Sequence, residues 1–103
     1  MAYRLRVDRR FLRLLDALPG DLRAVARRTI KNLAVEPRPT SAKELDEYPN
    51  HWRMWLPRRH RLIWRVLDDE QVIDVLYVGP KSSDLYEQLG LGRRLKDAEE
   101  ADR

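Results

Sequence analysis

Three runs of alternating apolar and polar residues follow one another between Trp52 and Val78, and only short turns separate them. They cover residues 52–56, 60–67 and 71–78, and β-branched and aromatic residues are frequent in them. A period of two residues is typical of a strand with one buried face. Because connections this short join antiparallel neighbours, the pattern predicts a meander, which Gly79-Pro80 is expected to end.

The N-terminal part predicts one strand and two helices. Residues 2–7 alternate as a strand does. Apolar residues then recur at helical spacing over residues 11–18, with Asp8 as the expected N-cap, and again over residues 22–33, with Asp21 as the expected N-cap. A proline-glycine pair separates the two helices, so they are expected to form an antiparallel hairpin that buries its apolar stripe against the sheet.

The remaining segments complete a one-domain prediction. Residues 42–45 are expected to form a short extended piece followed by a loop, and residues 83–89 a short helix. Residues 1–90 are predicted to be a single domain and residues 91–103 a charged tail. The expected fold class is α+β, with the order β-α-α-β-β-β-(short α). Its small antiparallel sheet, with a mixed edge, has about four strands and carries the helical hairpin on one face.

The composition narrows the classes of function. The chain has no cysteine and two isolated histidines, so neither a disulfide framework nor a metal site is expected, and no cofactor is predicted. The N-terminus has no apolar signal region, and no apolar run is long enough to cross a bilayer. The sequence therefore predicts a soluble, cytoplasmic protein with no membrane partner. The formal net charge is +4, which makes the placement of the charges more informative than their total.

Positive charge is concentrated in the middle of the chain, where no acidic residue occurs between Glu47 and Asp68. The same stretch contains five arginines, which are Arg53, Arg58, Arg59, Arg61 and Arg65.

Side-chain alternation predicts where these arginines lie. If Leu62, Trp64 and Val66 face the helices, Arg61 and Arg65 must lie on the opposite face, and the same alternation puts Arg53 and Trp55 there. Cross-strand neighbours lie roughly 5 Å apart, so we expect these four side chains to share one concave surface. Cations beside aromatic rings suit RNA, because phosphates need countercharge and unpaired bases stack on aromatic rings.

The order and length of these segments resemble the RelE/ParE superfamily of toxins from bacterial type II toxin-antitoxin systems. The resemblance runs from Tyr3 to about Leu89. It is carried by YRLRVDRRFLRLLDALP, NLAVEPRP, WRMWLPRRHRLIWRVLDDEQVIDVLYVG and a terminal Tyr86 after Lys81. It favours the RelE-like branch, whose members are endoribonucleases (mRNA interferases) that cut mRNA in the ribosomal A site. ParE-like members share the fold but act on DNA gyrase, and a cognate antitoxin silences both kinds.

Matching the RelE-like site residue by residue implies catalytic roles for Arg61, Lys81, Tyr86 and Arg53. Two positions depart from the family pattern: Trp55 stands where a second cation is expected, and Lys81 replaces an arginine, which keeps the charge but loses bidentate phosphate geometry. The expected RNA-binding residues are Arg58, Arg59, Arg65, Trp55 and His60.

Metal-independent cleavage would proceed by attack of a ribose 2′-hydroxyl on the adjacent phosphate. A guanidinium group keeps its proton under physiological conditions, so Arg61 and Arg53 are expected to stabilise the phosphate charge that develops in the transition state. Lys81 is expected to carry a proton, if neighbouring arginines favour its neutral form. Tyr86 is expected to orient the 2′-hydroxyl or to stack on a base.

Alternatives remain open at this point. The chain is alternatively a gyrase inhibitor without nuclease activity, or an inert homologue that only binds an antitoxin. Trp52 and Trp64 are predicted to be core residues, whereas Trp55 is either a base-stacking platform or part of the antitoxin interface. Arg61 is alternatively a solvated surface residue, and Tyr86 alternatively packs on the sheet. The antitoxin is expected to lay an amphipathic helix across the helical hairpin or to displace the helix that contains Tyr86, with its acids facing the arginines.

Overall fold

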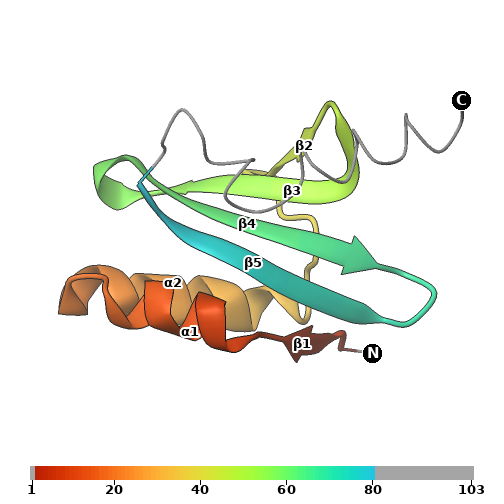
Figure 1. The fold of residues 1–103 in the computed structure, drawn as a ribbon. Coiled ribbons are helices and arrows are strands. Elements are labelled where there is room, and N and C mark those ends of the chain that lie inside the picture. The colour runs from red at the N-terminus through yellow and green to blue at the C-terminus, as the bar shows by residue number, and fades with distance from the viewer. Residues whose placement is uncertain (1, 81–103) are drawn as a thin grey trace, which may run out of the picture.

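The computed structural model describes residues 2–80 as two helices on one face of a five-stranded sheet (Figure 1). The helices are α1 (Arg9–Asp16) and α2 (Gly20–Leu33). The strands are β1 (Arg4–Arg6), β2 (Lys43–Leu45), β3 (Tyr48–Leu56), β4 (His60–Leu67) and β5 (Val72–Pro80), and a 3₁₀ turn at Pro57–Arg59 joins β3 to β4. Neither helix is long and apolar enough to cross a membrane.

The strand order β1-β5-β4-β3-β2 confirms the α+β fold and the antiparallel meander of β3, β4 and β5. β1 pairs with β5 in parallel, which is the mixed edge that the fold class anticipated. The short extended piece predicted at residues 42–45 forms β2, which pairs with β3 at the edge of the sheet opposite β1. The described sheet therefore has five strands. The predicted helix at residues 83–89 and the predicted tail lie outside the described residues.

The two helices begin in different ways. The Asp8 carboxylate accepts a hydrogen bond from the Phe11 amide at 2.8 Å, so the predicted cap of α1 is confirmed. The predicted Asp21 cap of α2 is wrong, because Pro19 occupies the N-cap position and Asp21 lies within the first turn. There its carboxylate forms an ion pair with Arg58 instead.

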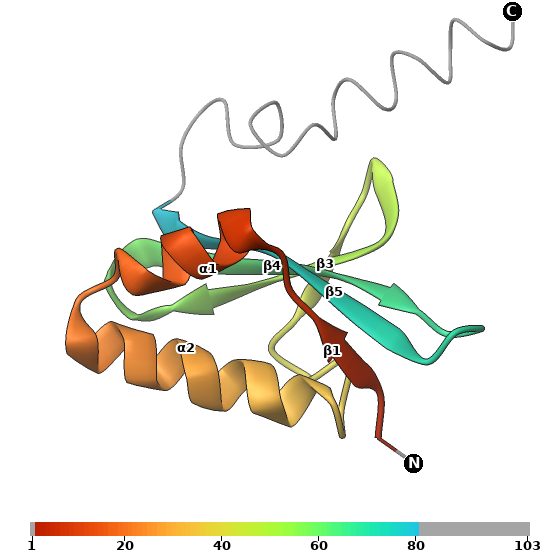
Figure 2. The same ribbon diagram turned by 60° about the horizontal axis from the view of Figure 1, so that its bottom comes forward.

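The main core lies between the helices and the sheet (Figure 2). Trp64 is fully buried, and its indole N–H donates a hydrogen bond to the Pro37 carbonyl at 2.9 Å. Leu62 and Val66 are buried in the same cluster, which confirms the alternation predicted for β4. Trp52 packs against this cluster while remaining half-buried.

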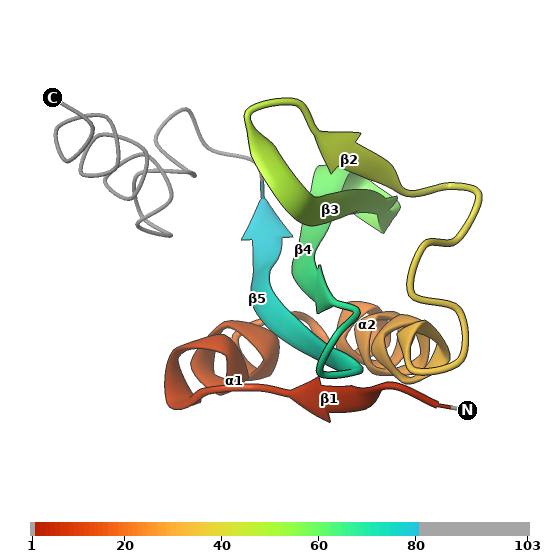
Figure 3. The same cartoon turned by 90° about the vertical axis from the view of Figure 1, so that its right-hand side faces the viewer.

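The opposite face of the sheet is less open than the sequence predicted. Leu45, Ile63 and Tyr77 form a second buried cluster there, against which Tyr48 packs. The predicted loop before β3 is also shorter than expected, because β3 begins at Tyr48. In Figure 3 the hairpin of β2 and β3 lies at the end of the sheet opposite β1 and the helices. Apolar residues therefore divide this face into separate polar regions.

A charged cluster joins the chain start to the turn after β4. The Asp68 carboxylate accepts hydrogen bonds from the Tyr3 hydroxyl at 2.7 Å and from Arg38 at 2.7 and 3.2 Å. The Arg38 bonds, followed by the Tyr3 bond, lower the pKa of Asp68, and the bond to Asp68 raises the pKa of Tyr3. Asp68 thus keeps its charge in the folded protein and holds these segments together.

Candidate nucleic-acid interface

Arg61 and Trp55 form the centre of the arginine-bearing surface. They are direct cross-strand partners on β4 and β3. The Arg61 guanidinium carbon lies 4.5 Å from the centroid of the Trp55 ring, within the range of a cation–π contact. Arg61 is only 6% exposed, whereas Trp55 is 48% exposed. The indole therefore covers a buried cation and still presents much of its own surface to solvent.

Gly79 makes room for Arg61 on the other side. It is the β5 partner of Arg61, and its φ is +155°, in the region that favours glycine. A Cβ at this position would lie 2.9 Å from the hydroxyl oxygen of Tyr77, which donates a hydrogen bond to the Pro80 carbonyl at 2.5 Å. Only glycine fits this approach, so no β5 side chain stands directly opposite Arg61. The last strand was predicted to end at Gly79-Pro80, but β5 includes both residues.

Arg53 joins Arg61 in a depression of about 540 Å³ at the β2–β3 hairpin. Three acidic side chains that were not predicted at this site also line the depression: Glu44, Asp46 and Glu47. These acids precede the arginine-rich stretch in the sequence, so the charge pattern of that stretch did not indicate them. Pairing of the short 42–45 strand with the next run is what brings them close to Arg53. The carboxylates reduce the positive potential on this side of Arg61.

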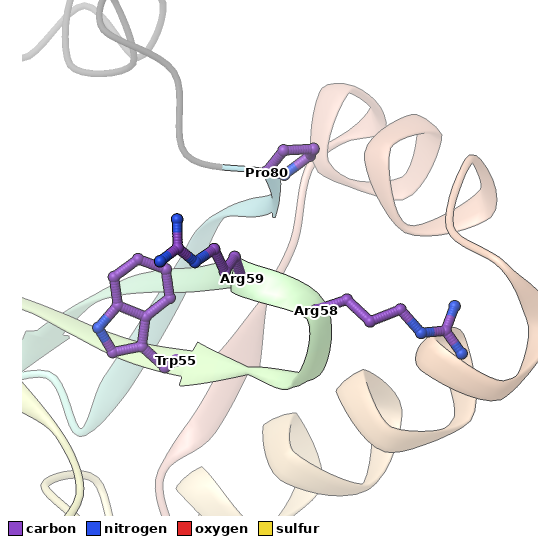
Figure 4. Close-up of a pocket in the computed structure, with 4 residues that line it drawn as sticks. All are labelled: Trp55, Arg58, Arg59 and Pro80. Atoms are coloured by element: carbon purple, nitrogen blue, oxygen red, sulfur yellow. The ribbon is translucent and has the colours of Figure 1, made fainter.

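The turn between β3 and β4 sends its two arginines in different directions (Figure 4). Arg58 and Arg59 both have a φ of 58°, in the left-handed region. Arg58 reaches α2 and pairs with Asp21, whereas Arg59 extends beside the Trp55 indole. Trp55, Arg58, Arg59 and Pro80 line a pocket of about 620 Å³, which we call the Trp55 pocket.

The remaining predicted site residues lie apart from this centre. Arg65 is four residues from Arg61 along β4, roughly 13 Å, and faces His51 and Asp74 in the neighbouring strands. His60 lies at the start of β4, with its Nδ1 3.0 Å from the Arg58 carbonyl. The structure thus brings Arg53, Trp55 and Arg61 together but not Arg65.

Lys81 and Tyr86 lie outside the described residues, so their predicted roles stay predictions. Within residues 2–80, no group of His, Asp or Glu side chains is arranged to hold a metal ion. The described part of the site offers guanidinium groups, an indole ring and the carboxylates of the β2–β3 hairpin.

The fold closely matches solved toxin structures. A free double arginine-to-alanine variant of Escherichia coli RelE gives a TM-score of 0.75 at 24% identity, covering 90% of this chain and 98% of that chain. The isolated E. coli RelE toxin gives 0.68 at 27% identity, covering 84% and 94%. The match to the intact E. coli RelBE toxin-antitoxin complex gives 0.69 at 26% identity, covering 79% and 99%. No family profile and no curated protein sequence matches the chain.

These matches define the class as the small α+β toxins with the RelE fold. The chain is similar in fold to the RelE toxins over most of its length, and the resemblance predicted from its sequence is confirmed.

Proposed function

We propose that this protein is a metal-independent endoribonuclease that cleaves mRNA at the ribosome and is held inactive by a cognate antitoxin. One observation carries the proposal. A nearly buried guanidinium, Arg61, is fixed against Trp55 on the face away from the helices, in a depression that it shares with Arg53. Two cations at one concave site suit a phosphate whose charge grows during reaction.

The proposed reaction is a transesterification. The ribose 2′-oxygen loses its proton and attacks the adjacent phosphorus, and the bond to the 5′-oxygen breaks as that oxygen takes up a proton. The products are a 2′,3′-cyclic phosphate and a 5′-hydroxyl. Arg61 and Arg53 stabilise the charge on the phosphate oxygens, and we assign proton transfer to Lys81 and the orientation of the 2′-hydroxyl to Tyr86.

The test compares RNA cleavage with gyrase inhibition. Purified protein is incubated with mRNA in the presence and absence of translating ribosomes, and an RNA with 2′-deoxy substitutions serves as the uncleavable control. We expect fragments that end in a 2′,3′-cyclic phosphate. A supercoiling assay with DNA gyrase runs in parallel. Intact RNA in every reaction together with inhibited supercoiling would instead support the ParE-like gyrase inhibitor. Intact RNA together with normal supercoiling would support the inert homologue that only binds an antitoxin.

The antitoxin has a suitable docking surface on the helices. A groove of about 480 Å³ between α1 and α2 is floored by apolar side chains, and two of these, Val7 and Leu12, are 42% and 44% exposed. Arg27, Arg28 and Lys31 line the same groove. Exposed apolar surface beside cations suits an amphipathic helix with acidic flanks, so we propose that such a helix of the antitoxin binds here.

Leu12→Asp is expected to weaken antitoxin binding by at least tenfold, because it places a charge in the apolar floor of the groove. Binding is measured by titrating the cognate antitoxin into each toxin variant. The matched control is Val35→Asp, which changes an apolar residue that is 80% exposed and outside the groove. Equal affinities for the two variants would place the antitoxin helix elsewhere.

A further inference from the structure

We propose that the Trp55 pocket binds a single unpaired RNA base, which stacks on the Trp55 indole while Arg59 contacts a neighbouring phosphate. The inference rests on the proposed function in one respect, that the ligand is RNA. It adds a nucleotide subsite at the position where the RelE-like pattern has a second cation. It also selects one of the two roles that the sequence left open for Trp55.

The indole is presented as a platform. Trp64 is fully buried and Trp52 is half-buried against the core, whereas Trp55 is 48% exposed. Its pairing with Arg61 across the strands and the contact at 4.5 Å fix the ring in place. A fixed, exposed aromatic ring beside a cation is what base stacking requires, because every base has a π-face and stacking needs no particular hydrogen-bond pattern.

The turn supplies a cation for the phosphate. Left-handed φ angles at two successive non-glycine residues are unfavourable and persist only where the surroundings hold them. Here one of the two, Arg58, is engaged by Asp21. The other, Arg59, points along the indole (Figure 4), and no described residue forms an ion pair with it.

Charge favours a nucleotide in this pocket over one in the Arg53 depression. Three carboxylates of the depression, Glu44, Asp46 and Glu47, offset its three cations, Lys43, Arg53 and Arg61, so its described lining carries no net positive charge. The described lining of the Trp55 pocket contains no carboxylate, and of its two arginines Arg58 is paired with Asp21 whereas Arg59 contributes its full charge. An RNA strand with its scissile phosphate at Arg61 is therefore drawn toward Arg59, and the adjacent base reaches the indole. The base must be unpaired, since a base within a duplex does not expose its face.

The experiment uses the full chain and a short single-stranded RNA with 2′-O-methyl groups, which resists cleavage. Matched RNAs carry one abasic nucleotide at each position in turn. Trp55→Ala is expected to raise the dissociation constant for the intact RNA roughly 5- to 100-fold, and Trp55→Phe to restore most of the affinity. For the RNA that lacks the stacked base, Trp55→Ala is expected to have no further effect. Arg59→Ala is expected to reduce the slope of log affinity against log salt by about 0.7.

Each contrary result has a distinct meaning. An equal loss on intact and all abasic RNAs would overturn the proposal, because Trp55 would then act only by holding Arg61. Unchanged RNA affinity together with weaker binding of the cognate antitoxin would assign the ring to the protein interface. Circular dichroism confirms that each variant is folded. Base-dependent binding without cleavage of ordinary RNA would refute the nuclease but leave this subsite standing.

Discussion

Replacing Arg61 with alanine is expected to slow the proposed RNA cleavage by about 100- to 1000-fold. Loss of one preorganised donor to a developing oxyanion typically has an effect of this size. Arg61 is 6% exposed and is held against Trp55, so its guanidinium is already oriented before substrate binds. The measurement is the single-turnover cleavage rate at saturating enzyme, which separates the chemical step from RNA binding.

Two further variants make this prediction specific. Arg61→Lys keeps the charge but loses the planar fork, so we expect it to recover only part of the rate. Arg13→Ala removes an exposed arginine from α1 and is expected to leave the rate within about twofold of wild type, because a surface charge on the helical side contributes little. If Arg61→Ala cleaved RNA as fast as Arg13→Ala, Arg61 would have no part in the reaction.

Trp64→Ala is expected to lower the free energy of unfolding by about 3–5 kcal/mol, the usual cost of truncating a large buried aromatic residue. The substitution opens a cavity among the core residues between sheet and helices and leaves the Pro37 carbonyl without its donor. For a domain of this size such a loss is a large fraction of the free energy of unfolding. Urea denaturation monitored by circular dichroism gives the value.

Two other variants, Trp64→Phe and Trp55→Ala, are compared with Trp64→Ala. Trp64→Phe keeps most of the apolar volume and loses only the indole hydrogen bond, so we expect a cost of about 1–2 kcal/mol. Trp55→Ala removes the same residue type from a half-exposed position and is expected to cost less than Trp64→Ala. A smaller loss for Trp64→Ala than for Trp55→Ala would contradict the core assignment.

The spacing of apolar residues predicted most of the helices and strands, because that spacing follows directly from which face of each element is buried. The alternation around Trp64 identified the face of β4 that packs on the helices, and Asp8 identified the start of α1. The predicted Asp21 cap is wrong because Pro19, two residues earlier, already occupies the N-cap position of α2. Local sequence does not say which of two nearby positions starts a helix when both are compatible with it.

Alternation predicted part of the candidate site but not its boundaries. It placed Trp55 and Arg61 on one face, which the cross-strand pairing of β3 and β4 confirms. It did not anticipate that Ile63 and Tyr77 bury the middle of that face, nor that acids of the β2–β3 hairpin approach Arg53. Both features depend on contacts between segments distant in sequence. The opposite directions of Arg58 and Arg59 depend on turn angles, which a period-two pattern does not encode.

The parallel pairing of β1 with β5 has a consequence for synthesis of the chain. The first strand to leave the ribosome completes the sheet only after the last described strand has emerged, because residues 4–6 pair with residues 72–74. Such distant contacts form late and slow folding. Arg61 likewise has its Gly79 neighbour only once β5 is in place. A nascent copy of this protein therefore lacks an assembled arginine surface until nearly the whole domain has been translated.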